Sequence, residues 1–160
     1  MKGTYVLIIE NSKDTEIEIG KIGRIAFKEG FYAYVGSALS GLERRIERHL
    51  RDPGDNKKLH WHIDYLLASP AVKVKEVVFA ETVARRRECE LAVHMNLVSI
   101  TNFGCSDCRC KSHLFYSTSV TRLKEHVYTS FYESGFDLFY WGIVAGKDVE
   151  HLRATKINPV

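Results

Sequence analysis

The sequence predicts an α/β (α+β) domain with a small, mostly antiparallel sheet flanked by helices. Hydrophobic residues make up 45% of the 160 residues and charged residues 27%, so a globular core can form. Strand-like and helix-like segments interleave, and hairpins join the early strands, which favours antiparallel pairing over a Rossmann fold. We expect a single domain over residues 1–160 with its core in 1–100. Residues 101–160 would add a Cys-containing loop, a helix and a strand that pack on this core.

Four strands are expected in the first quarter of the chain. Residues 4–10 form an apolar run typical of a buried strand, and residues 16–19 alternate charged and apolar side chains like a half-buried strand. Residues 22–27 and the aromatic-rich residues 31–35 complete the set. Residues 28–30 have the composition of a hairpin turn between these last two strands.

A helix over residues 40–50 follows the strands. Ser40 is a suitable N-cap, and Glu43, three residues later, completes a capping box. Apolar residues recur at three- or four-residue steps and predict one buried stripe, made of Leu39, Leu42, Ile46 and Leu50.

Helices and strands alternate in the rest of the chain. The patterns predict helices over residues 60–68, 83–97 and 122–133, and strands over residues 75–80, 114–117 and 139–145. Gly135 is expected to end the last helix. The many aromatic residues of this C-terminal part are expected to pack that helix on the sheet.

Bulk composition limits the function. The net charge of +3 and the pI of about 8.6 are too mildly basic to indicate nucleic-acid binding by themselves. The longest apolar runs are too short to span a bilayer, so no membrane association is expected. The first residues lead directly into a strand without the pattern of a signal peptide, so we expect a cytoplasmic protein.

Local charge is more informative than bulk charge. Residues 44–58 contain six basic and three acidic side chains, which are Arg44, Arg45, Arg48, Arg51, Lys57 and Lys58 against Glu47, Asp52 and Asp55. Residues 85–87 are three consecutive arginines. Either cluster alone is typical of a solvated helix face. Two clusters that flank one candidate site favour a phosphate-binding surface.

Three short motifs lie in the first third of the chain. Gly3-Thr4-Tyr5 opens the first strand, Tyr34-Val35-Gly36 ends a later strand, and Arg45 and His49 lie one helical turn apart. This combination resembles the GIY-YIG nuclease superfamily, which includes the excision-repair nuclease subunit and some homing and restriction endonucleases. The resemblance covers residues 3–100. The full length is similar to a mainly archaeal branch of that superfamily, whose members carry a similar Cys-rich segment.

The resemblance implies a metal-dependent endonuclease that hydrolyses a phosphodiester in DNA or in a structured nucleic acid, in DNA repair or processing. It implies DNA as a partner rather than RNA, with a repair protein as a further partner. By resemblance, Tyr5 is the general base and Tyr34 supports it. His49 is the rival base, because an imidazole titrates near neutral pH without help.

Arg45 suits the stabilisation of charge on phosphorus, because its guanidinium is always charged and matches phosphate oxygens. Three residues turn about 300° on a helix, so Arg45 and His49 lie roughly 60° from the apolar stripe, at the rim of the core. Other basic residues are candidates to contact the phosphate backbone, namely Arg44, Arg48, Lys57 and Lys58.

The resemblance places the metal ligand on a glutamate of the helix over residues 83–97. Glu88 is the first choice and Glu90 the second. One carboxylate, completed by waters and phosphate oxygens, suits a single Mg²⁺ or Mn²⁺ ion. Ser37 can donate a hydrogen bond to a phosphate.

A second polar group lies at residues 60–64. The resemblance places His60 near a helix that lines the site, where it can contact substrate, and Asp64, one helical turn later, can orient its ring. The alternative is a helix N-terminal turn, in which these polar residues cap the helix and Trp61 packs in the core.

Four residues after position 100 have the side-chain types of a tetrahedral zinc site, namely Cys105, Cys108, Cys110 and His113. They form one run of nine residues, whereas zinc sites usually pair two short knuckles separated by a longer loop. Ordinary loop and core use is the simpler interpretation, Zn²⁺ binding is the main alternative, and a redox or nucleophilic role of the cysteines is the third. Cys89 is expected in the core.

Two rival functions are kept open. The fold can serve as a nucleic-acid-binding module that does not cleave, which predicts salt-sensitive binding alone. The chain can also be a zinc-stabilised interaction domain of a repair or RNA-processing complex, which predicts bound zinc and a partner surface on the aromatic C-terminal half.

Overall fold

The computed structural model describes residues 1–52, 58–82, 87–141, 143–144, 147–148 and 155–157. The strands are β1 (Gly3–Asn11), β2 (Thr15–Ile19), β3 (Gly23–Phe27), β4 (Gly30–Ala38), β5 (Val72–Glu81), β6 (Val98–Ser99), β7 (Leu114–Ser117), β8 (Leu138–Trp141), β9 (Ile143–Val144), β10 (Lys147–Asp148) and β11 (Thr155–Ile157). The helices are α1 (Leu42–Leu50), α2 (His62–Leu67), α3 (Glu88–His94) and α4 (Val120–Glu133). The predicted mixed α/β fold is therefore confirmed.

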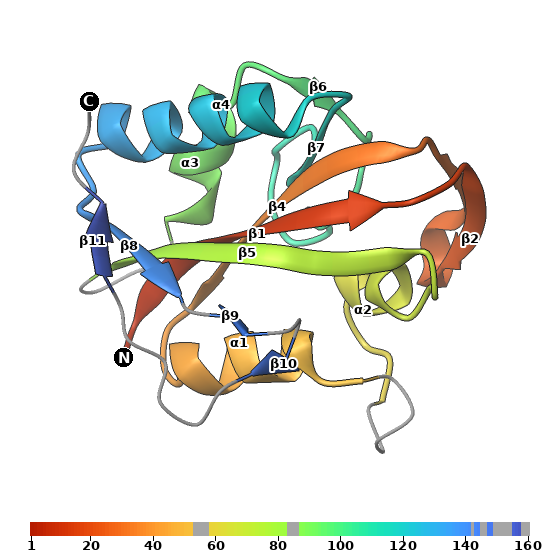
Figure 1. Ribbon diagram of the computed structural model, residues 1–160, viewed down its shortest axis with the longest axis horizontal. Helices are drawn as coiled ribbons and strands as arrows, with labels where there is room; N and C mark the ends of the chain where they lie inside the picture. The colour runs from red at the N-terminus through yellow and green to blue at the C-terminus, as the bar shows by residue number, and fades with distance from the viewer. Residues whose placement is uncertain (53–57, 83–86, 142, 145–146, 149–154, 158–160) are drawn as a thin grey trace.

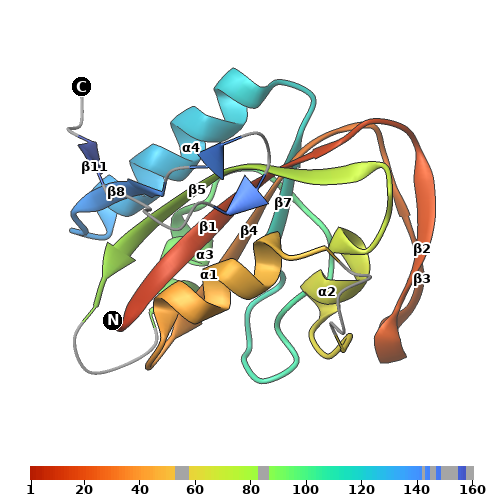
Figure 2. The same ribbon diagram turned by 60° about the horizontal axis from the view of Figure 1, so that its bottom comes forward.

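One seven-stranded sheet organises the domain. Its strand order is β11-β8-β5-β1-β4-β7-β6, and every neighbouring pair in it is antiparallel. Figure 1 shows α3 and α4 on one face of this sheet and α1 and α2 on the other, and the turned view of Figure 2 agrees. The prediction of an antiparallel sheet flanked by helices is confirmed.

The central strand β1 is apolar along most of its length because both of its faces are covered. Tyr5 and Leu7 point to the α1 and α2 side, where they join one core cluster. Val6 and Ile8 point to the α3 and α4 side and join a second cluster. A strand that alternates between two cores has no solvent face, so its sequence reads as a continuous hydrophobic run.

Strands β2 and β3 form a separate two-stranded hairpin between β1 and β4. In Figure 1 this hairpin extends from the end of the sheet beside α2. Ile19 and Phe27 are buried at its base, and Glu16 and Glu18 are exposed. The hairpin lies within the connection between Tyr5 and the second motif, Tyr34-Val35-Gly36, and lengthens it.

Helix α1 begins differently from the prediction. Gly41 adopts a left-handed conformation (φ 63°) and is the N-cap, without a side-chain cap bond, so the predicted Ser40 cap is wrong. The Leu42 N–H instead donates to the carbonyl of Met1 at 3.0 Å. Leu39 precedes the helix and is 50% exposed, so it is not part of the buried stripe. A left-handed glycine turns the chain sharply out of β4, and the N-terminal residue supplies the acceptor.

The other helices differ from the predicted ones mainly in length. Helix α2 is shorter than the predicted 60–68. Helix α3 is shorter than the predicted 83–97, of which residues 83–86 lie outside the described residues. Helix α4 begins after Ser119, whose hydroxyl accepts the Arg122 N–H, and Gly135 follows it with a φ of 76°. No helix in the described part of the chain is long and apolar enough to cross a membrane.

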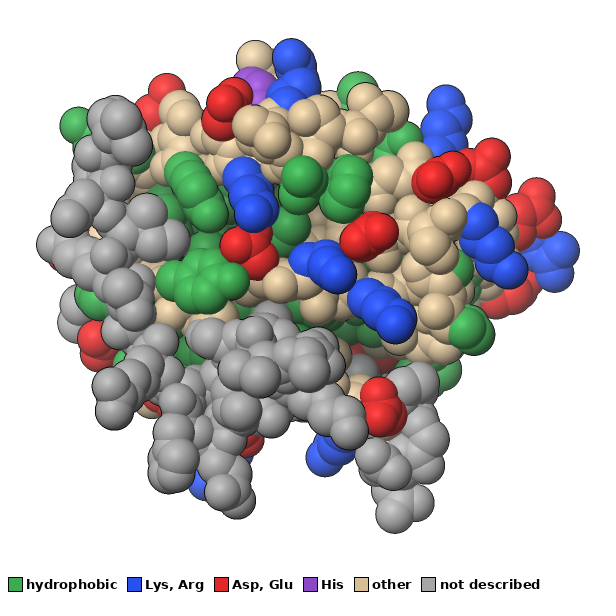
Figure 3. All heavy atoms as spheres, viewed as in Figure 1, with side chains coloured by type: hydrophobic (Ala, Val, Ile, Leu, Met, Phe, Trp, Pro, Cys, Tyr) green, Lys and Arg blue, Asp and Glu red, His purple; other side chains and the backbone are tan. Residues whose placement is uncertain are grey.

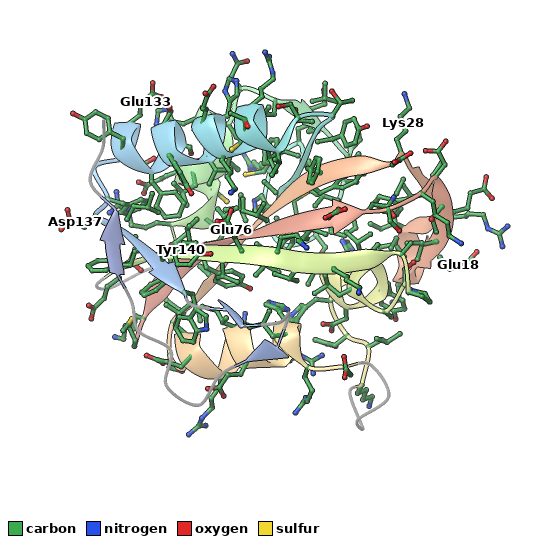
Figure 4. The ribbon with its side chains drawn as sticks, in the orientation of Figure 1. Glu18, Lys28, Glu76, Glu133, Asp137 and Tyr140 are labelled. Atoms are coloured by element: carbon green, nitrogen blue, oxygen red, sulfur yellow. The ribbon has the colours of Figure 1, made fainter. Side chains whose placement is uncertain are left out.

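Polar side chains also occur on the α4 side of the sheet. Glu76 of β5 and Tyr140 of β8 lie together there (Figure 4), and Lys124 of α4 pairs with Glu76 at 2.5 Å. At the far end of α4, Glu133 pairs with His94 of α3 at 3.5 Å. These contacts tie α4 to the sheet and to α3.

The N-terminal turn of α2 depends on one buried carboxylate. Asp64 is fully buried, and its Oδ2 accepts the backbone N–H groups of His60 and Trp61 and an N–H of Arg48, at 2.9, 2.9 and 2.7 Å. Burial acts to raise the pKa of Asp64, but these donors outweigh it and the pKa lies below its usual value.

We predict that Asp64→Asn lowers the free energy of unfolding by about 2–3 kcal/mol near neutral pH, because charge-assisted hydrogen bonds are lost. The folded-state pKa is depressed, so this stabilisation is present above about pH 4 and is lost as the pH falls through the folded value. Urea unfolding of both proteins at neutral and acidic pH measures it. The exposed Asp52→Asn serves as the matched control. Equal stabilities of Asp64→Asn and wild type at neutral pH would contradict the prediction.

Candidate functional site

The candidate site lies where a sheet edge is left open. Along β4, strand β7 pairs only with Phe31–Tyr34, and in the described chain no strand pairs with the outer edge of residues 35–38. The Val35 N–H instead donates to the carbonyl of His113, at 2.9 Å, in the loop before β7. A pocket of about 350 Å³ opens at this edge. Side chains from both faces of the sheet can reach it.

The two motif tyrosines and His49 of α1 meet on the face of the sheet that α1 and α2 cover. The Tyr5 hydroxyl lies 2.7 Å from His49 Nε2, and both side chains are buried. The ring centroids of Tyr5 and Tyr34 are 6.5 Å apart, and those of Tyr34 and His49 are 6.3 Å apart. These three residues line the pocket.

Gly36 makes the position of Tyr5 possible. The two residues are paired across β1 and β4, and a Cβ atom added at Gly36 would lie 2.5 Å from the Tyr5 Cζ and hydroxyl oxygen. The phenol therefore occupies the space that any larger residue at position 36 would fill.

Arg45 also lines the pocket. Its Nη1 donates to the backbone carbonyl of Ser37 at 3.1 Å. Its guanidinium carbon lies 4.4 Å from the centroid of the Trp61 ring. Two contacts of different kinds hold a permanent positive charge next to Tyr5, which is the requirement for stabilising an anion there.

Ser37 and Glu88 reach the pocket from the other face of the sheet, which α3 and α4 cover. The Ser37 hydroxyl donates to Glu88 Oε2 at 2.5 Å, and both residues are buried and line the pocket. Glu88 is the first residue of α3. The alternative ligand Glu90 is two residues further on, where Arg87 binds its carboxylate at 2.6 Å. Of the two glutamates, Glu88 faces the pocket.

Burial favours the protonated phenol at both motif tyrosines. Burial raises the pKa of Tyr5 far above its usual value, and the nearby Arg45 offsets only part of this. Burial likewise raises the pKa of Tyr34, and the neighbouring Tyr5 adds to the rise. The Tyr5 O–H can therefore donate to His49 Nε2 when that nitrogen carries no proton.

The predicted phosphate contacts occupy different places. Arg44 and Lys58 are exposed, and Lys57 lies outside the described residues, as do Arg85 and Arg86. Arg48 is held by Asp64 and by the Lys58 carbonyl, each at 2.7 Å. Figure 3 shows basic and acidic side chains interspersed on the face in view rather than gathered into one basic tract.

His60 lines the pocket with an exposed side chain, and its ring packs against Trp61 with centroids 5.4 Å apart. Asp64 binds the backbone N–H of His60, so the prediction that it orients the imidazole is wrong. The reason is geometric, because a carboxylate at the third position of a helix reaches back to the free N–H groups of the first turn.

A second chemical group adjoins the pocket, whose lining includes one of its members, His113. Cys89, Cys108, Cys110 and His113 each offer a ligand atom, and these four atoms lie within 4.8 Å of one another. The Sγ atoms of Cys89 and Cys108 are 3.7 and 3.6 Å from His113 Nε2. Three thiols and one imidazole in this arrangement can hold a metal ion.

The composition of this group corrects two predictions. Cys105 is not a member of the group, and its buried thiol instead contacts the carbonyl of Lys111 at 3.7 Å. Cys89, which was expected in the core, is the fourth member. The crowded spacing of the predicted run was the available signal, because metal sites usually draw their ligands from two separate segments.

Burial favours the protonated thiol at two members of this group. Burial raises the pKa of Cys89 and of Cys110, and the neighbouring thiols add to the rise for Cys89. Metal binding requires thiolates, so an incoming cation must displace these protons.

The family described as domain of unknown function DUF123 matches residues 4–135. The chain belongs to this family. The DUF123 match runs from β1 to just beyond α4, so it includes both the pocket and the Cys and His group. No curated protein and no solved structure gives a significant match.

We predict that Gly36→Ala lowers the free energy of unfolding by about 1–3 kcal/mol, because the new methyl group must displace the Tyr5 ring. Urea unfolding measures the loss. A double-mutant cycle tests the cause, since the same substitution in a Tyr5→Ala background should cost much less. An equal cost in both backgrounds would show that the clash with Tyr5 is not the reason.

Proposed function

We propose that this protein is a metal-dependent endonuclease that hydrolyses a phosphodiester in DNA or in a structured nucleic acid. The observation that carries the proposal is the convergence of the Tyr5–His49 pair, Arg45 and Glu88 on one pocket. Phosphodiester hydrolysis needs a group that accepts a proton from water, a fixed positive charge and a divalent cation. The resemblance of the motifs to GIY-YIG nucleases supports the same assignment.

The metal assignment follows from the donor chemistry. Glu88 is a carboxylate at 9% exposure that faces the pocket, and a hard cation such as Mg²⁺ or Mn²⁺ prefers such an oxygen. Ser37 holds this carboxylate in place from β4. The ion, when bound, would polarise a phosphoryl oxygen and lower the barrier to attack on phosphorus. As a single carboxylate ligand, Glu88 would need waters and substrate oxygens to complete the coordination of such an ion.

The proton pathway combines the two candidate bases. A tyrosinate at position 5 is costly because burial raises the Tyr5 pKa. In our scheme, the Tyr5 oxygen takes a proton from the attacking water while its own proton passes to His49 Nε2, 2.7 Å away. The water oxygen forms a bond to phosphorus, and the bond to the leaving oxygen breaks. The buried ring of Tyr34 packs beside both side chains and fixes their positions.

Arg45 would stabilise the negative charge that develops on the phosphoryl oxygens. Its bond to the Ser37 carbonyl and its stacking on Trp61 fix the guanidinium before substrate arrives. A charge that needs no reorganisation is worth more to the transition state than a mobile one. His60 lines the pocket with an exposed side chain, and Arg44 and Lys58 are also exposed, so all three are proposed to contact flanking phosphates.

For the Cys and His group we infer Zn²⁺ as the metal. Cys89, Cys108, Cys110 and His113 supply the four soft or borderline donors of a closed tetrahedral site. All four positions would be occupied by protein, so this site would be structural rather than catalytic. Zinc here also agrees with the rival interpretation of an interaction domain, and the pocket residues favour the nuclease.

We predict Mg²⁺- or Mn²⁺-dependent cleavage by the wild-type protein, assayed over plasmid, single-stranded, flap, junction and RNA substrates. Arg45→Ala should reduce the rate by about 10²–10³-fold, because a preorganised charge is lost. Glu88→Gln should abolish cleavage, because its metal ligand is lost. Glu90→Gln is the matched control, one half-turn away on the same helix, and should retain activity.

Two outcomes would contradict this prediction. Cleavage that survives both Arg45→Ala and Glu88→Gln would place the chemistry elsewhere. No cleavage by any variant, with binding that weakens steeply as salt rises, would support the non-catalytic nucleic-acid-binding module instead.

A further inference from the structure

The Cys and His group is joined to the pocket through two separate connections. Cys89 directly follows Glu88 in the first turn of α3, so the ligand of one centre is the chain neighbour of the ligand of the other. His113 both lines the pocket and supplies its carbonyl to Val35, at the open edge of β4. The group therefore joins the first turn of α3 to His113, the loop residue that binds the open edge of β4.

Helix α3 needs such a connection. It has seven residues and no side-chain cap at Arg87, so it is too short to be stable through its own hydrogen bonds. Leu91 and Ala92 anchor its later part in the core. Its first turn carries Glu88 and Cys89. The Ser37 hydroxyl donates to the Glu88 carboxylate, and the Cys89 thiol contacts His113 Nε2.

The loop before β7 likewise depends on contacts with other segments. Its ends are fixed by backbone bonds, including His113 N–H to the Phe103 carbonyl at 2.8 Å and Asn102 N–H to the Lys111 carbonyl at 2.9 Å. Between these ends the loop carries Cys108 and Cys110, and it places Ser106 and Asp107 in the pocket lining. The contacts of the thiols with His113 are long, at 3.6 and 3.7 Å, and are weak hydrogen bonds.

We propose that metal binding by Cys89, Cys108, Cys110 and His113 positions Glu88, so that this centre and the divalent-cation site of the pocket bind their metals cooperatively. The proposal rests on the proposed function for the role of Glu88. Metal–thiolate bonds replace weak contacts between α3 and the loop, which fixes the first turn of the helix. Cys89 is then a positioning residue that acts on the pocket through its neighbour.

Cooperativity between two sites is reciprocal. If zinc at the thiols raises the affinity of the pocket for Mn²⁺, then Mn²⁺ in the pocket raises the affinity of the thiols for zinc by the same factor. The chain itself supplies the means to separate the two sites, because Glu88→Gln removes the carboxylate of one without altering any ligand of the other.

The test measures Mn²⁺ binding by electron paramagnetic resonance on the full chain without nucleic acid. We expect the zinc-loaded wild type to bind Mn²⁺ about tenfold or more tightly than the zinc-free variant Cys108→Ser, within the usual range of coupling between sites. Cys105→Ser is the matched control, because Cys105 lies outside the group, and it should behave as wild type. Cys108→His restores a four-ligand set and should recover Mn²⁺ affinity.

The reciprocal measurement titrates zinc against a chelator. Saturating Mn²⁺ should tighten zinc binding by the same factor in wild type and leave it unchanged in Glu88→Gln. Equal Mn²⁺ affinities in zinc-loaded and zinc-free protein would overturn the proposal. A Cys108→Ser chain that circular dichroism shows to be globally unfolded would also overturn it, because the metal would then hold the whole fold. Absence of Mn²⁺ binding even in zinc-loaded wild type would instead refute the metal role of Glu88 in the proposed function.

Discussion

The early end of β7 on β4 is the constraint on which the site depends. Strand β4 continues from residue 35 to residue 38 without a described neighbour on its outer edge, so backbone and side chains from both faces of the sheet reach one space. Tyr5 and His49 approach it from the α1 face, and Ser37 and Glu88 from the α3 face. A longer β7 would separate these two sets with a wall of paired backbone. The pocket thus results from strand pairing as much as from the residues that line it.

Much of the fold could be predicted from the sequence because both sheet faces are covered. The period of two and the hairpin turns predict the early strands, and the i, i+3 and i+4 spacing predicts α1. The structure also gives a physical reason for the glycine of the second motif. Gly36 is paired with Tyr5, whose ring fills the space above it, so the two motifs are parts of one packing arrangement.

The wrong Ser40 cap and the missed role of Cys89 share a cause, which is a contact between distant segments. No local pattern shows that the Met1 carbonyl accepts the first N–H of α1, so the Ser40 cap was predicted from composition alone. The membership of Cys89 in the metal-binding group depends on how α3 packs against a loop about twenty residues later. The ion pair of Arg48 with Asp64 likewise joins two helices that periodicity treats separately. Local chemistry identifies the candidate residues, and tertiary packing decides how they combine.

Anomalous diffraction from crystals of the zinc-loaded protein soaked in Mn²⁺ tests most directly whether the protein has two metal centres, one in the pocket and one at the Cys and His group. We expect a Mn²⁺ peak within coordination distance of the Glu88 carboxylate, and a separate zinc peak among Cys89, Cys108, Cys110 and His113. A Mn²⁺ peak found only at the thiols, or none in the pocket, would contradict it. A zinc peak beside Cys105 would contradict the assignment of the second centre.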